Sequence, residues 1–251
     1  MVIDVKNVTV QYTVSNFREI GLKEYLIKKV KREIKTEHFT AVDNVSFSLE
    51  EGDFLGIIGT NGAGKSTLLK VISGIMKPAR GSVTVNGKIA ALLELGSGFD
   101  GDLTLNENIY LRGAMLGYTK EFVTEKYKEI LEYAELTEFE NRAFKQLSSG
   151  MKSRLAFAIS CLMEPEILIL DEATSSIDTR TEMHIQEAMV ALMKGRTSLI
   201  IAHRLSTIRD ADKIVVISGG KVVEAGDHDE LLAQKGEYYK LYQSQFAGIA
   251  T

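Results

Sequence analysis

A glycine-rich loop carries the clearest chemistry in the sequence. Residues 59–67 read Gly-Thr-Asn-Gly-Ala-Gly-Lys-Ser-Thr and satisfy the pattern G-x-x-x-x-G-K-[ST]. Glycines in such a loop let backbone N–H groups turn inward around phosphate oxygens, where a side chain would collide. A chance glycine turn would look similar, but a buried strand before it (Phe54–Ile58) and a helix after it (residues 67–74) favour phosphate binding.

The loop predicts a site for a nucleoside triphosphate, with ATP and Mg²⁺ expected as cofactors. Lys65 should reach the β- and γ-phosphates, which also makes it a candidate catalytic residue, and Ser66 should offer its hydroxyl to the metal. The nucleotide-binding residues expected in the loop are Gly59, Asn61, Gly62, Ala63, Gly64, Lys65, Ser66 and Thr67.

Two acidic residues end a later apolar run. Residues 167–170 lead directly into Asp171 and Glu172. Asp171 could hold Mg²⁺ through its water shell, and Glu172 could polarise an attacking water as a general base. Two acids after a strand often only cap a helix, but together with the glycine loop they favour ATP hydrolysis.

Apolar patterns along the chain predict an α/β fold. Three segments near the N-terminus alternate apolar and polar residues, as a half-buried antiparallel sheet would: residues 2–10, 41–49 and 82–85. Short apolar runs separated by helical patterns predict buried parallel strands covered on both faces: Phe54–Ile58 and residues 167–170, 198–202 and 213–217.

A long helical pattern interrupts this arrangement. It covers most of residues 102–140, and a further helix follows at residues 148–163. The core positions expected in the longer stretch are Leu105, Ile109, Leu111, Phe122, Tyr127, Ile130, Leu131 and Tyr133.

A lysine-rich segment at residues 22–35 also has a helical pattern. Leu22, Leu26, Val30 and Ile34 recur every fourth residue, with basic residues around them. The segment could be a solvated helix that packs one stripe onto its own domain, or a basic helix near a membrane surface or partner. Charge alone slightly favours the first interpretation.

Composition narrows the class of protein. The chain has 251 residues, a net charge of −4 and one cysteine, Cys161. The acidic balance argues against a nucleic acid partner, and a single cysteine fits a reducing compartment. No apolar run reaches the length of a membrane span and the first residues lack a secretory signal, so a cytoplasmic location is expected.

Residues 147–151, Leu-Ser-Ser-Gly-Met, resemble the signature motif of ATP-binding-cassette (ABC) ATPases, usually written Leu-Ser-Gly-Gly-Gln. The pentapeptide is also a good helix cap, but its position between the glycine loop and the acids is decisive. Further matches are Tyr12, where the family stacks an aromatic on adenine, Asp178 in the loop that crosses to the partner subunit, and His203, the switch histidine. For Tyr12, a packed tyrosine at a strand end remains an alternative.

The resemblance covers essentially the whole chain and implies a P-loop NTPase of the ABC type. Its RecA-like parallel sheet would carry an N-terminal antiparallel β subdomain and an inserted α-helical subdomain. Within one ATPase domain (1–251), the β subdomain and core would cover residues 1–95, the helical subdomain about 96–163, and the remaining core 164–251.

The same resemblance implies a dimer that sandwiches ATP. Ser148, Ser149 and Gly150 of one copy would close over the phosphate loop of a second copy. Hydrolysis, with Glu172 and His203 as catalytic residues, would then drive membrane-spanning transporter subunits from the inner face of the plasma membrane.

One loop departs from the family pattern. Where the family carries a glutamine, residues 90–99 have none, and Glu94 is the candidate for that position and for a metal ligand. This stretch, residues 103–111 and the basic segment resemble exporters of polysaccharides, O-antigens and teichoic acids. That resemblance raises the membrane-interface interpretation of the basic segment above the alternative.

The last third resembles a different subfamily. Residues 171–178, 201–207 and 226–242 are similar to fused lipid and multidrug exporters, which predicts a mosaic, natural or engineered, joined near residues 167–171. The favoured function is the ATPase of a lipid-linked polysaccharide exporter. The alternatives are the ATPase of a lipid or multidrug exporter, a soluble ABC ATPase acting on nucleic acid, and a kinase, which would need neither the signature nor the histidine.

Overall fold

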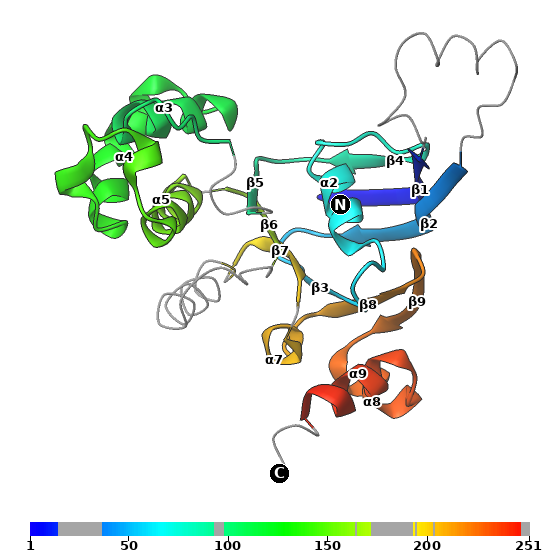
Figure 1. Cartoon of the computed structure of the whole chain (residues 1–251). Helices are drawn as coiled ribbons and strands as arrows, with labels where there is room; N and C mark the ends of the chain where they lie inside the picture. The colour runs from blue at the N-terminus through cyan, green and yellow to red at the C-terminus, as the bar shows by residue number, and fades with distance from the viewer. Residues whose placement is uncertain are drawn as a thin grey trace, which may run out of the picture.

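The structure is a computed structural model that describes residues 1–14, 37–92, 98–163, 165–171, 193, 195–202 and 204–246 (Figure 1). The basic segment at residues 22–35 lies outside this part of the chain, as do Glu94, Glu172, Asp178 and His203. The described residues form a three-stranded sheet, a six-stranded sheet and a group of helices. The predicted α/β class is confirmed.

The smaller sheet is antiparallel and has the strand order β2-β1-β4. Its strands are β1 (Ile3–Val14), β2 (Glu37–Leu49) and β4 (Arg80–Val85). The predicted strands at 2–10 and 41–49 are both extended in the structure. Beyond the alternating stretch they continue to pair, through Gln11 with Thr40 and Tyr12 with Phe39.

The larger sheet has the strand order β5-β6-β7-β3-β8-β9. Its strands are β3 (Phe54–Ile58), β5 (Ile89–Leu92), β6 (Ile167–Asp171), β7 (Thr197–Ile201), β8 (Lys213–Ser218) and β9 (Lys221–Gly226). All neighbours are parallel except β8 and β9. The central strands are mostly apolar and buried because both faces of this sheet are covered.

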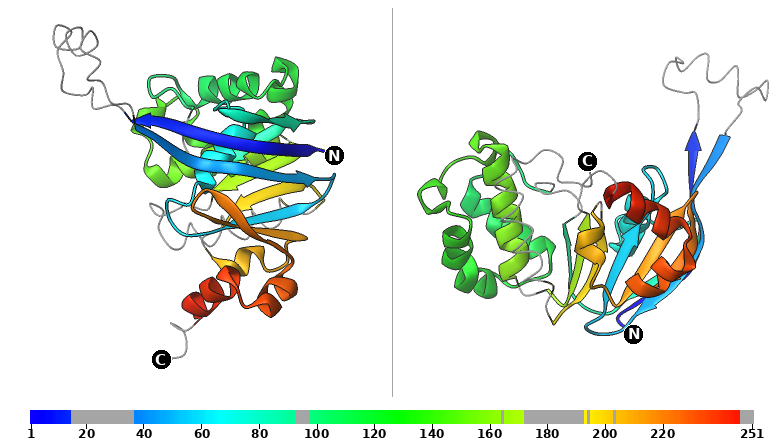
Figure 2. Two further views of the ribbon diagram at one scale, coloured as in Figure 1. Left: turned by 90° about the vertical axis from the view of Figure 1, so that its right-hand side faces the viewer. Right: turned by 90° about the horizontal axis from the view of Figure 1, so that it is seen from below.

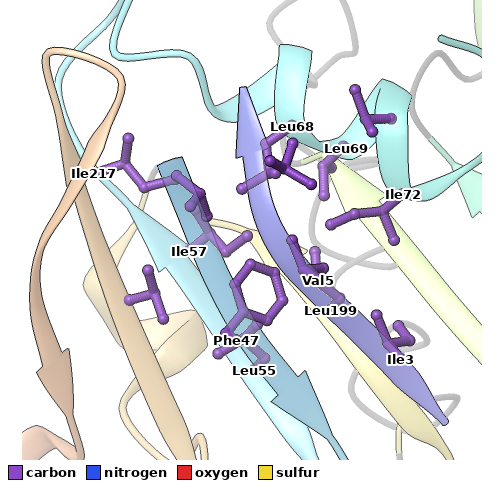
Figure 3. Close-up of a cluster of buried hydrophobic side chains, with 14 of the residues drawn as sticks. Ile3, Val5, Phe47, Leu55, Ile57, Leu68, Leu69, Ile72, Leu199 and Ile217 are labelled. Atoms are coloured by element: carbon purple, nitrogen blue, oxygen red, sulfur yellow. The ribbon is translucent and has the colours of Figure 1, made fainter. Parts of the chain in front are cut away.

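The two faces of the larger sheet have different partners (Figure 2). One face packs against the smaller sheet and α2 (Lys65–Ile72), and its core includes Leu55, Ile57, Leu199 and Ile217 (Figure 3). The other face packs against the helices of the C-terminal region: α7 (Leu205–Ile208), α8 (His228–Gln234) and α9 (Glu237–Phe246).

A separate core holds the helical group between β5 and β6. Its helices are α3 (Leu105–Met115), α4 (Lys120–Tyr133) and α5 (Ser149–Leu162). Leu105, Ile109 and Ile130 are fully buried there, as predicted. The predictions for Leu111 and Tyr133 are wrong: they are 37% and 49% exposed, because the helical period places them away from the buried stripe.

Among the described helices, none is long and apolar enough to cross a membrane. The proposed subdomain boundaries near residues 95 and 163 remain a prediction.

Candidate functional site

The predicted phosphate loop joins β3 to α2 and passes very close to two other strands. A Cβ on Gly59 would collide with the carbonyl oxygen of Ile217 in β8, and one on Gly64 with that of Ala41 in β2. Gly64 also has a φ of 100°, a conformation that side chains disfavour. Glycine is therefore required at both positions for the loop to pass between these strands.

Backbone hydrogen bonds hold the loop in this position. The turn between β8 and β9 donates from Gly220 N to Ala63 O at 3.1 Å, and Gly220 O accepts from Asp43 N at 2.8 Å. Within the loop, Ala63 N donates to Thr60 O at 3.2 Å. The loop is thus bonded to the turn between β8 and β9, and that turn is itself bonded to β2.

Lys65, the first residue of α2, turns its side chain back into the loop. Its Nζ donates to Gly59 O at 2.8 Å and to Thr60 O at 2.9 Å, and the residue is 6% exposed. Burial lowers the pKa of Lys65, an effect that the nearby Asp171 carboxylate partly offsets. An ammonium has three donors, so it can hold these carbonyls and still donate to a phosphate oxygen.

Ser66 and Asp171 meet at the head of the loop. The Ser66 hydroxyl donates to Asp171 Oδ2 at 2.9 Å, although the two residues are 105 positions apart. Hydroxyl and carboxylate oxygens are hard ligands of the kind that Mg²⁺ takes, so the donor set fits this metal. The third predicted metal ligand, Glu94, lies outside the described residues.

A pocket of about 430 Å³ opens over the loop. The Tyr12 hydroxyl lies 3.4 Å from Thr67 Oγ1 and 3.8 Å from Met76 Sδ. The residues that line the pocket are Tyr12, Phe39, Ala41, Asn61, Gly62, Ala63, Gly64, Lys65, Ser66, Thr67 and Asp171. The structure therefore brings together most of the predicted site residues, and it adds Phe39 and Ala41, which belong to no motif.

The signature segment does not join this pocket within the chain. Ser148 is the N-cap of α5, where its Oγ accepts from Met151 N at 3.2 Å. Ser148 and Ser149 are exposed, and a Cβ on Gly150 would meet nothing within 4 Å. These residues form the start of α5, a helix of the helical group (Figure 1).

Comparisons with known proteins agree with this fold and pocket. The ABC transporter family model matches residues 42–175. The O-antigen export system ATP-binding protein RfbB of Klebsiella pneumoniae is 35% identical over 243 residues, which cover 95% of this chain and 97% of RfbB. The chain belongs to the ABC transporter family.

Other relatives are longer than this chain. The teichoic acids export ATP-binding protein TagH of Bacillus anthracis is 41% identical over 208 residues, which cover 82% of this chain and 38% of TagH. The ATP-dependent lipid A-core flippase of Idiomarina loihiensis is 34% identical over 227 residues, covering 84% of this chain and 39% of the flippase. Relatives of both predicted subfamilies therefore match.

A solved structure shares the fold and carries nucleotide. It is a dimeric, post-hydrolysis state of an ATP-binding cassette bound to ADP and Pi, with a TM-score of 0.68 and 26% identity. The match covers 90% of this chain and 98% of that one. With the family match, it identifies this chain as an ATP-binding ATPase of the ABC type, a class whose members form dimers and work with membrane components.

The close approach of the loop to β2 gives a prediction about stability. Gly64→Ala should lower the free energy of unfolding by roughly 3 kcal/mol or more, since its Cβ would meet Ala41 O and the backbone would be strained. Gly62→Ala is the matched control: its φ is 79° but the space around it is open, so about 1 kcal/mol is expected. Urea unfolding measures both, and equal losses would contradict the steric account.

Proposed function

We propose that this chain binds Mg²⁺ and ATP in the phosphate-loop pocket and powers a membrane exporter of lipid-linked polysaccharide, of the O-antigen or teichoic acid type. The observation that carries the nucleotide assignment is the meeting of Lys65, Ser66 and Asp171 at the head of one glycine loop. The cargo is supported by the relatives RfbB, an O-antigen export protein, and TagH, a teichoic acid export protein.

The loop and Lys65 bind the phosphates in this proposal. Backbone N–H groups of the loop and of the first turn of α2 donate to phosphate oxygens, where the helix dipole also favours negative charge. The Lys65 ammonium, already directed into the loop by Gly59 O and Thr60 O, adds a positive charge beside the β- and γ-phosphates. Tyr12, which also lines the pocket, stacks on the base.

Ser66 and Asp171 are the residues that would hold Mg²⁺. When bound, Mg²⁺ neutralises charge on the phosphate oxygens. Ser66 is held by the first turn of α2 and Asp171 by the end of β6, so each oxygen comes from a rigid element. Glu172 as general base, His203 as sensor of the γ-phosphate, Asp178 at the partner and Glu94 remain predictions from the sequence.

The exposed signature segment supports a site shared between two copies. Ser148, Ser149 and Gly150 lie at the open N-terminus of the 14-residue helix α5 and are absent from the lining of the chain's own pocket. A second copy facing this one would place these donors against the γ-phosphate. ATP would then hold two chains together, and its hydrolysis would release them on the inner face of the plasma membrane.

A second candidate function has one observation in its favour. The lipid A-core flippase matches 84% of this chain, so the cargo could be a lipid rather than a polysaccharide. The two proposals share the site and the dimer and differ in the cargo and in the membrane partner.

The metal assignment predicts a selective loss. Lys65→Ala should abolish measurable ATP binding, because it removes the charge inside the loop. Ser66→Ala and Asp171→Asn should bind ATP as wild type does in EDTA but lose most of the gain in affinity that Mg²⁺ gives, about tenfold or more. Calorimetry measures each, with Lys70→Ala on the same helix as control. Equal Mg²⁺ dependence in Ser66→Ala and wild type would contradict the assignment.

The shared site predicts a change in size. Glu172→Gln with ATP and Mg²⁺ should elute as a dimer, because ATP persists when the proposed base is removed. Adding Ser148→Asp should abolish that dimer, since an aspartate still caps α5 but repels the phosphate; Ser148→Asn is the neutral cap that controls for it. Light scattering after gel filtration measures the mass. A dimer that survives Ser148→Asp would exclude the proposed interface.

The cargo is tested in cells. Depletion of the chain should leave lipid-linked polysaccharide inside the cell, and wild type but not Lys65→Ala should restore it at the surface. Labelled glycan at the surface is the measurement. Normal surface polysaccharide together with accumulated lipid would favour the lipid exporter instead.

A further inference from the structure

Phe39 gives the nucleotide pocket a second aromatic side chain. It lies on β2 directly opposite Tyr12 on β1. Side chains of directly paired residues in antiparallel strands share one face, with Cβ atoms about 5 Å apart. Both residues line the pocket over the phosphate loop. The two side chains therefore reach the same pocket from one face of adjacent strands.

The register that places both rings on this face is held by their neighbours. Gln11 Nε2 donates to Thr40 Oγ1 at 3.4 Å, and Thr13 Oγ1 lies 3.4 Å from His38 Nδ1. These pairs flank the aromatic pair and point to the opposite face of the strands. A shift of one residue would turn one ring to the opposite face, so the polar pairs also hold the rings together.

Phe39 is unusually exposed for a phenylalanine. It is 57% exposed, against 37% for Tyr12, so more than half of its apolar surface meets water in the absence of ligand. Covering that surface is favourable. The lining residues contributed by β1 and β2, Tyr12, Phe39 and Ala41, carry no charge, whereas Lys65 and Asp171 are the charged residues of the lining. The exposed ring of Phe39 is therefore apolar surface that a flat base would cover.

We infer that Phe39 is a second base-contacting residue, which with Tyr12 forms a stacking surface wider than one ring. This rests on the proposed nucleotide site. Stacking on aromatic side chains tolerates any base, because each base has a π face. Phe39 therefore raises the affinity for ATP, ADP and GTP alike and contributes nothing to the binding of a bare triphosphate.

The experiment compares ligands with and without a base. Phe39→Ala should raise the Kd for ATP and ADP about five- to tenfold, whereas the Kd for inorganic tripolyphosphate should stay at the wild-type value. Phe39→Leu keeps apolar surface but loses the ring, so its Kd for ATP should lie between those of wild type and Phe39→Ala. The leucine variant also serves as the test if the alanine variant does not fold. Val223→Ala, an exposed apolar residue on β9, should change nothing.

Each other outcome has a distinct meaning. Wild-type ATP affinity in Phe39→Ala, or an equal loss for ATP and tripolyphosphate, would overturn the role of Phe39. A loss confined to ATP-driven dimerisation would assign Phe39 to an interface and also overturn it. Failure of the wild-type chain to bind ATP at all would instead refute the proposed site, as would unchanged binding of both ligands in Lys65→Ala.

Discussion

The site depends on how closely the backbone of residues 59–64 passes two neighbouring strands. Because Gly59 and Gly64 lack side chains, the loop fits between the carbonyl oxygens of Ile217 and Ala41. That position lets Lys65 turn back to the loop's own carbonyls and sets Ser66 against Asp171 at the end of β6. One steric requirement thus aligns groups from β2, β3, β6 and α2 around a single anion site.

The pocket and the signature segment lie in different parts of the described chain. The pocket is lined by the glycine loop, by Lys65 and by Tyr12. The signature residues Ser148 and Gly150 begin α5 in a separately packed helical group. Because the helical group has its own core, the signature residues are positioned independently of the pocket. In the proposed dimer, ATP bound in the pocket of one copy would meet the signature of the other.

Local patterns predicted the parts of this fold that have local causes. The glycine loop, β3 and Asp171 are all visible in sequence, since each has a motif or an apolar run. Strand β9 was missed, although the Gly219-Gly220 turn after β8 is a hairpin signal. Phe39 was missed for a different reason. It pairs with Tyr12, which lies on another strand and 27 positions earlier in the chain, and no local pattern reveals that register.

The mosaic join and the roles of several site residues remain predictions from the sequence. The join of the mosaic was placed near β6, and in the structure β6 pairs with β5 on one side and β7 on the other. A join within β6 would have to preserve both pairings. It would therefore require both parent sequences to supply a buried, apolar strand at this position. The roles of Glu172, His203 and Asp178 remain predictions from the family resemblance.

The proposed site requires that backbone N–H groups of the glycine loop donate hydrogen bonds to the phosphates of ATP. Amide hydrogen exchange at residues 60–64, measured with and without Mg²⁺ and a non-hydrolysable ATP analogue, tests it most directly. The account predicts that these amides exchange much more slowly with the analogue and no differently with adenosine. Unchanged exchange with the analogue, or equal slowing with adenosine, would contradict it.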